Sequence, residues 1–228
     1  MYTAATTGDF NTNPVIYGQV NPFIVTYGDL VQIVVNNLDA AAHPFHLHGH
    51  HFQVLDRPRS GTGSWPYRDV NYASTPVQRD TVTVMANSFA VLRFRATNPG
   101  TWLFHCHIEW HVEMGLTATI IEAPECLEGL TFPADHIAAC QKAGIPYRGN
   151  AAGNTQNPLD QTGFITVPPV AYTGSVLWSL HLSRSLNRQG TNSSRSPQSQ
   201  LCRPSQRPPP ASCSEVDVVN LRNRTCTE

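Results

Sequence analysis

Apolar and polar residues alternate in several short segments of the chain. Glycine, proline, asparagine and aspartate residues separate these segments, as in Tyr27-Gly28 and Pro99-Gly100. Such alternation, or a short apolar run between turn signals, is typical of β-strands that bury one or both faces. The predicted strands cover residues 23–27, 30–36, 51–56, 80–85, 89–96, 101–108 and 116–122. Their spacing predicts an all-β fold, a β-sandwich with Greek-key connections.

The pattern divides the chain into three parts. Residues 1–123 hold the predicted strands and form the expected sandwich domain. Residues 124–174 predict an irregular extension, packed on the domain or trailing it, with one short helix near residues 136–143. Residues 175–228 contain 11 serines and 5 prolines without a sustained apolar period, so we expect a disordered tail. This tail is either a basic binding segment or an artefact of the gene model.

Length and charge limit the possible functions. A chain of 228 residues can form one domain of ordinary size with extensions. The formal net charge of -1 gives no reason to expect a nucleic-acid partner. Charge is uneven, because residues 1–174 contain 8 basic and 13 acidic residues, whereas residues 175–228 contain 7 arginines and 3 acidic residues.

Two histidine clusters carry the candidate chemistry. They are HPFHLHGH at residues 43–50 and HCHIEWHVEMGL at residues 105–116. Side chains alternate across a strand, so His105 and His107 share one face while Cys106 points to the other. The pair His46 and His48 shares a face in the same way. His43 precedes Pro44, which favours extended backbone and can aim the His43 ring elsewhere.

These residue types suit copper. A blue copper centre needs one thiolate, two imidazoles and a weak or absent axial donor. Cys106, His43 and His111 meet that need, and either Met114 or Leu116 would occupy the axial position. Zinc also accepts histidine and cysteine, but a cysteine flanked by histidines on alternate faces is poor geometry for one tetrahedral ion. We interpret His50 and His51 as neighbours of the ligands or surface residues.

Both clusters resemble the copper-binding motifs of the last cupredoxin domain of multicopper oxidases, the family of laccases and ferroxidases. The resemblance implies a cupredoxin-like domain with copper as its cofactor. It also implies type 1 ligands His43, Cys106 and His111, a non-ligating axial Leu116, a type 2 ligand His46, and type 3 ligands His48, His105 and His107. Residues 144–163 resemble the segment that follows this domain in fungal iron-uptake ferroxidases. The loop at residues 57–79 is expected to lie over the metal end.

Two carboxylates near the ligands are candidate catalytic residues. Asp39 precedes His43 by four residues, where the iron-oxidising branch of the family uses a carboxylate to bind ferrous iron. The alternative is a turn or capping role. Glu109 would relay protons to reduced oxygen as a general acid, or else form a surface salt bridge. Trp110 is interpreted as a packing residue and Glu113 as a surface residue.

Cysteines and targeting signals say little about the compartment. Cys126 and Cys140 are either a disulfide pair or two free thiols. The first residues predict no secretory signal, and no apolar run is long enough to span a membrane. The family resemblance implies a secreted protein or one at the outer face of the plasma membrane.

Three functional hypotheses follow from these motifs. The first is a domain of a multicopper oxidase that oxidises ferrous iron or phenols and, in the full enzyme, reduces dioxygen to water. The family builds its trinuclear site with further histidines from another domain, so this chain would supply half of that site. The second is a stand-alone blue copper electron carrier, and the third is an inactive truncated product. The sequence leaves open whether iron or a phenol is the substrate.

Overall fold

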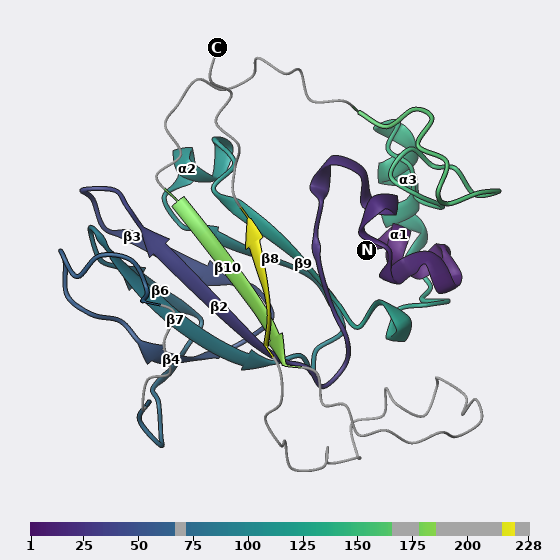
Figure 1. The fold of residues 1–228 in the computed structure, drawn as a ribbon. Coiled ribbons are helices and arrows are strands. Elements are labelled where there is room, and N and C mark those ends of the chain that lie inside the picture. The colour runs from purple at the N-terminus through teal and green to yellow at the C-terminus, as the bar shows by residue number, and fades with distance from the viewer. Residues whose placement is uncertain (67–71, 166–177, 186–215, 222–228) are drawn as a thin grey trace, which may run out of the picture.

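Two β-sheets form the centre of the molecule (Figure 1). The computed structural model describes residues 1–66, 72–165, 178–185 and 216–221. In the first sheet, the strand order is β1 (Phe23–Val25), β9 (Thr117–Glu122), β8 (Gly100–Cys106), β3 (His43–Leu47) and β6 (Thr81–Val84). In the second sheet, it is β11 (Val216–Leu221), β10 (Trp178–Ser185), β2 (Leu30–Asn37), β7 (Ser88–Arg95), β4 (Phe52–Asp56) and β5 (Gln78–Arg79).

From β2 to β8 the chain crosses repeatedly between the two sheets, apart from the short β5, which pairs with β4. β2 lies in the second sheet, β3 in the first, β4 in the second, β6 in the first and β7 in the second. Each predicted strand segment overlaps one observed strand, whereas β3, β5, β10 and β11 were not among the predicted segments. The prediction of an all-β sandwich is therefore confirmed.

The core lies between the sheets and comes from the inward positions of the alternating strands. In β3, His43, Phe45 and Leu47 are buried, whereas Pro44 and His46 are only partly buried. In β8, Phe104 and Cys106 belong to the same core, and Phe45 lies opposite Cys106. Because side chains alternate along each strand, Cys106 and His43 both point into the space between the sheets. They lie next to the core residues at one end of the sandwich.

The N-terminal segment packs beside the sheets. It contains α1 (Tyr2–Thr6), η1 (Gly8–Thr12) and η2 (Pro14–Val20), and it contacts η3 (Pro124–Cys126). A small apolar cluster holds it there, formed by Ala4, Ile16, Tyr17, Ile121 and Leu127. The N-terminal segment therefore packs against the end of β9 through buried apolar side chains.

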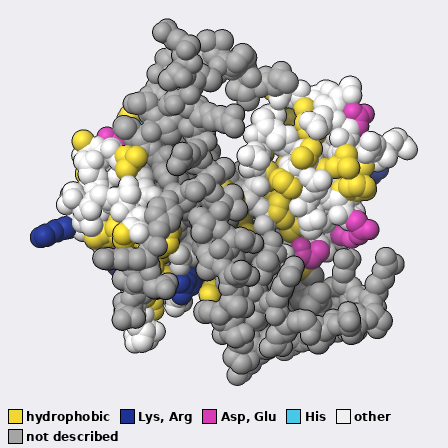
Figure 2. Space-filling model, in the orientation of Figure 1, with side chains coloured by type: hydrophobic (Ala, Val, Ile, Leu, Met, Phe, Trp, Pro, Cys, Tyr) yellow, Lys and Arg dark blue, Asp and Glu magenta, His cyan; other side chains and the backbone are white. Residues whose placement is uncertain are grey.

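The extension after residue 124 packs against the N-terminal segment. The amide of Ala151 donates to the Ile16 carbonyl at 2.8 Å, and the amide of Gly149 donates to Thr6 Oγ1 at 3.0 Å. Helix α3 (Ala134–Lys142) confirms the helix expected near residues 136–143. Hydrophobic side chains show on the right of Figure 2, where Figure 1 places α1 and α3.

Two segments of the C-terminal tail do not fit the expectation of disorder. β10 pairs antiparallel with all of β2, from Trp178 opposite Asn37 to Ser185 opposite Leu30, and β11 pairs with β10. The side of β2 away from β7 offers backbone donors and acceptors that a further strand can satisfy. The order WSLHLSRS alternates apolar and polar residues, a strand signal that the serine-rich composition outweighed. The other tail residues lie outside the described part of the chain.

The cysteines and the long loop resolve two further expectations. Cys126 is disulfide-bonded while Cys140 is a free thiol, so these two residues do not form a pair.

In the long loop at residues 57–79, the amide of Gly63 donates to the Asn87 carbonyl, and the Asn87 amide donates to the Asp39 carbonyl. The described start of the loop therefore lies beside the end of the sandwich that carries Asp39. Trp65 then packs on the outer face of the second sheet. Among the described residues, no helix is both long and apolar enough to cross a membrane.

Candidate metal centre

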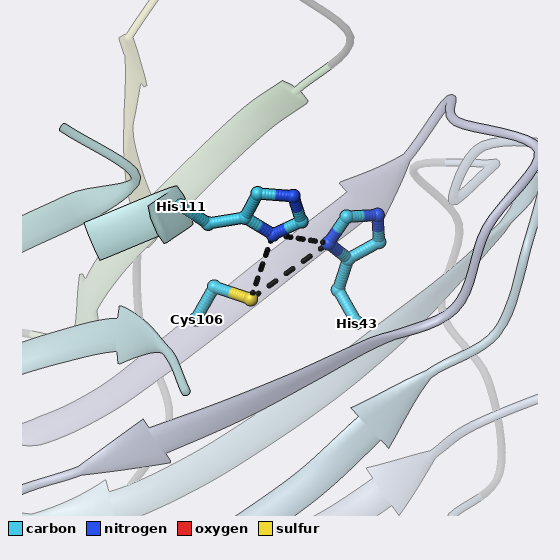
Figure 3. Close-up of side chains that lie close together, drawn as sticks. All are labelled: His43, Cys106 and His111. Atoms are coloured by element: carbon cyan, nitrogen blue, oxygen red, sulfur yellow. Dashed lines mark hydrogen bonds between the residues drawn. The ribbon is translucent and has the colours of Figure 1, made fainter. Parts of the chain in front are cut away.

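Cys106, His43 and His111 converge at one end of the sandwich (Figure 3). Cys106 Sγ lies 3.4 Å from His111 Nδ1 and 3.7 Å from His43 Nδ1, and the two Nδ1 atoms are 3.1 Å apart. One ion held at about 2.3 Å by sulfur and about 2.0 Å by nitrogen would place such donors roughly 3–4 Å apart. The three donor atoms are therefore spaced like ligands of a single metal ion.

The loop after β8 brings His111 back to Cys106. His111 lies on the short helix α2 (Glu109–Glu113), and Gly115 adopts a positive φ of 87° that reverses the chain. The Leu116 amide then donates to the His111 carbonyl, and the Cys106 amide donates to the Leu116 carbonyl. Glycine suits this reversal because a side chain disfavours positive φ.

The same loop gives the two candidate axial residues different surroundings. Leu116 packs against the core cluster that contains Cys106, whereas Met114 is 53% exposed. Leu116 carries no donor atom. The Met114 thioether, which could coordinate, lies on the surface instead.

Asp39 contacts the triad through the His43 ring. Asp39 Oδ2 lies 2.9 Å from His43 Nε2, so Nε2–H donates to the carboxylate and Nδ1 keeps a lone pair for a metal. This hydrogen bond holds the pKa of Asp39 below its usual range. The Asp39 side chain is 30% exposed, so solvent ions can reach it.

Burial shapes the protonation of the other two ligands. It raises the pKa of the Cys106 thiol, opposed by a backbone hydrogen bond at Ile108. It also lowers the pKa of His111, with a smaller contribution from the charge of His43. The neutral imidazole is the form that binds metal, whereas the thiol must lose its proton first.

This donor set fits copper better than zinc. Structural zinc sites use four protein ligands. In the described part of the chain the donors that gather here are one thiolate and two imidazoles, and an aliphatic side chain lies beside them. Three such donors with a weak or absent axial ligand are typical of blue copper centres.

Four further histidines of the two clusters, His46, His48, His105 and His107, gather on the outer face of the first sheet. His48 Nε2 lies 3.0 Å from His105 Nε2, and the His46 ring lies 5.0 to 5.9 Å from the rings of His48, His105 and His107. His46 lies opposite His105 in the β3–β8 register. The expected alternation of Cys106 and its two neighbours is therefore present.

Two of these rings have their orientation set by hydrogen bonds at Nδ1. His46 Nδ1 lies 2.9 Å from the Asp80 carbonyl, and His105 Nδ1 lies 2.9 Å from the Cys106 carbonyl. Both rings then present Nε2 to the group. Partial desolvation, followed by the charges of the neighbouring histidines, lowers the pKa of His48.

The remaining candidates lie on α2. Glu109 is exposed at its first residue, and Glu113 is exposed at its last. Trp110 is 59% exposed, and its ring centroid lies 4.0 Å from that of His111, so its packing is limited to one side.

The sequence interpretation of His50 missed its buried partner Glu122, because their 72-residue separation carries no local signal.

Comparison with known proteins agrees with this geometry. The family model described as "Multicopper oxidase" matches residues 1–125, more than half of the 228-residue chain. The iron transport multicopper oxidase fetC of Epichloe festucae is 47% identical over 182 residues, which cover 76% of this chain and 29% of that protein. The iron transport multicopper oxidase fio1 of Schizosaccharomyces pombe is 43% identical over 173 residues, which cover 74% of this chain and 28% of that protein.

A solved structure shares the fold. The crystal structure of Fet3p, a multicopper oxidase that functions in iron import, matches with a TM-score of 0.64 and 39% sequence identity. The match covers 70% of this chain and 32% of that chain. This chain thus spans less than a third of the length of these relatives. With the family model and the relatives in agreement, the chain belongs to the multicopper oxidases, a family of copper-binding oxidoreductases.

Proposed function

We propose that this chain provides the C-terminal, third cupredoxin domain of an iron-oxidising multicopper oxidase, with residues 1–123 as the domain itself. The convergence of Cys106, His43 and His111, with Asp39 bonded to His43, is the observation that carries the proposal. These three ligands would hold type 1 copper, with Leu116 at the axial position. Copper bound there would supply reversible one-electron redox chemistry, with a potential that a non-ligating axial residue raises.

Asp39 would bind the ferrous substrate. Its carboxylate is partly exposed, and its lowered pKa keeps it ionised at neutral pH. Oxygen ligands stabilise ferric iron, which favours loss of an electron from the bound ion. The hydrogen bond from Asp39 to His43 then joins the iron-binding group directly to a ligand ring. The names of the relatives, iron transport multicopper oxidases, support iron over a phenol.

The four outer histidines would supply half of a trinuclear copper site. In this proposal, His46 is a type 2 ligand and His48, His105 and His107 are type 3 ligands. Cys106 lies between His105 and His107 in sequence, so the two sites share a covalent path of a few bonds. Because the chain spans less than a third of its relatives, dioxygen reduction would need ligands from the rest of a longer protein. In that protein Glu109 would donate protons to reduced oxygen, on the outer side of the cell.

A stand-alone blue copper domain is the second candidate. It is favoured because the thiolate, both imidazoles and the axial residue all come from this chain, within residues 43–116. Such a domain would exchange single electrons without consuming oxygen. A phenol remains the alternative electron donor for either candidate.

Copper loading of the purified chain tests both candidates. We expect intense visible absorption that Cys106→Ser abolishes, and faster bleaching by ferrous iron than by hydroquinone. Bleaching without oxygen uptake supports a domain that depends on a longer protein or a stand-alone carrier. Co-expression with the preceding part of a related oxidase then separates these two, because only a domain of the larger enzyme would restore uptake. A chain that takes up no copper would leave only the inactive product.

A further inference from the structure

His48 differs from its neighbours in how its position is set. β3 ends at Leu47, so His48 lies just beyond the strand, and its amide donates to the Leu103 carbonyl at 2.9 Å. His46 and His105 each have a hydrogen bond at Nδ1, but within the described part of the chain His48 has none. The His48 ring is also exposed. Its position therefore depends on the backbone turn that carries it.

The indole of Trp102 covers this turn. Gly49 has a φ of 73°, and a Cβ built on it would lie 2.6 Å from the Trp102 ring. A Cβ built on Gly100 would lie 2.5 Å from the same ring. The ring thus lies flat against the backbone of both glycines. Any side chain at Gly49 would push the turn away from β8.

Asn98 connects the indole to the turn. Trp102 Nε1 donates to the Asn98 carbonyl at 2.8 Å, and Asn98 Nδ2 donates to the Gly49 carbonyl at 2.9 Å. The turn is therefore covered by the indole ring, and Asn98 forms hydrogen bonds with both the ring and the turn.

A buried hydrogen bond between His50 and Glu122 ties the next residue of the turn to the same site. His50 Nε2 lies 2.5 Å from Glu122 Oε2, and Glu122 is fully buried. Glu122 Oε1 accepts from the Asn98 amide at 2.7 Å. A buried carboxylate is costly without partners, and here both of its oxygens have one. His50 and Asn98 are thus held by a single side chain.

We propose that Gly49, His50, Asn98, Trp102 and Glu122 form a turn clamp that positions His48 for metal binding. This inference rests on the proposed function, because it assigns the four outer histidines to copper. His48 and His105 already place their Nε2 atoms 3.0 Å apart, as two ligands of one ion would be. Loss of outer interactions that orient metal ligands costs about 10–100-fold in affinity. The clamp acts in this way on the backbone of His48 rather than on its ring.

Copper(II) titration in a Cys106→Ser background tests the clamp, because that change removes the thiolate of the other site. The measured signal is the part of the copper(II) binding that is lost in the His48→Gln variant. We expect Glu122→Gln and Trp102→Phe to weaken this binding about tenfold to a hundredfold. His51→Gln, a change of the exposed neighbouring histidine, is the matched control and should leave it unaltered.

Two further measurements separate positioning from general damage. In the chain with Cys106 intact, both clamp variants should keep the visible absorption of the copper-loaded triad. In the metal-free chain, imidazole NMR signals of His48 should shift in the clamp variants while those of His111 stay in place. Equal copper affinity in parent and clamp variants, or loss of the triad absorption together with histidine binding, overturns the clamp. Absence of the His48-dependent signal in the parent chain instead overturns the assignment of the four outer histidines to copper, on which the clamp rests.

Discussion

The carboxylate of Asp39 lies 2.9 Å from Nε2 of His43, on the opposite side of the imidazole ring from the Cys106 sulfur. One ring therefore has a thiol beside Nδ1 and a partly exposed carboxylate beside Nε2. This arrangement gives an ion bound at the surface a short connection to the buried triad.

Replacing Asp39 with asparagine should slow reduction of the copper-loaded chain by ferrous iron. The charge-assisted contact contributes about 1.5–3 kcal/mol, so we expect a loss of about tenfold to a hundredfold. Stopped-flow bleaching of the visible band measures the rate. Asp135→Asn, on the distant helix α3, is the matched control. An unchanged rate with iron would remove Asp39 from the proposed substrate site.

Leu116→Met should lower the reduction potential of the triad. The thioether would add a weak axial ligand, and axial ligands tune the potential of blue copper sites. We expect a shift on the order of 59 mV, which is a tenfold change in a one-electron equilibrium. Redox titration of the visible band measures it. Met114→Leu should cause no shift, because Met114 is 53% exposed, and a shift there would place the axial position at residue 114.

Metal binding at the triad should release about one proton near neutral pH. Burial raises the pKa of the Cys106 thiol, so the thiol is protonated until the metal displaces its proton. Apparent affinity should therefore rise by about tenfold per pH unit in this range. Calorimetric titrations in buffers of different ionisation enthalpy count the protons. Binding without proton release would show that Cys106 is already a thiolate.

The metal-free chain should be less stable at pH 5 than at pH 7. The pKa values of His48 and His111 are lowered in the folded state. Their contribution is present above the unfolded value of about 6.5 and is lost as the pH falls through the lower folded values. Urea unfolding at the two pH values measures the difference. His48→Gln with His111→Gln should reduce it, whereas His136→Gln on α3 should not.

A proline at Leu182 should open the edge of β2. Leu182 lies opposite Ile33 in the β10–β2 pairing, and proline removes the backbone donor and disrupts the strand. We expect faster amide exchange in β2 and self-association through its exposed edge. Hydrogen exchange and size-exclusion chromatography measure these changes, with Leu182→Val as the control. Unchanged protection of β2 would mean that β10 contributes little to this sheet.

Alternation along the chain was enough to predict most strands of the sandwich and the opposite orientation of Cys106 and its flanking histidines. Side chains follow a period of two in any extended segment, whatever the tertiary context. His43 was separated from His46 and His48 for another reason, because the following Pro44 favours extended backbone and can aim the His43 ring elsewhere. The identity of the donors also indicated copper, because ligand chemistry belongs to the residue types themselves.

Only the folded chain decided the choices that depend on long-range contacts. The path of the loop at Gly115 placed Leu116 beside Cys106 and left Met114 on the surface. The pairing of His50 with Glu122 joins residues that no local pattern relates. Packing of the sheets creates such contacts, and local sequence carries no record of them. Strand β10 shows the same principle, since an open edge of β2 gave order to a segment whose composition alone indicated disorder.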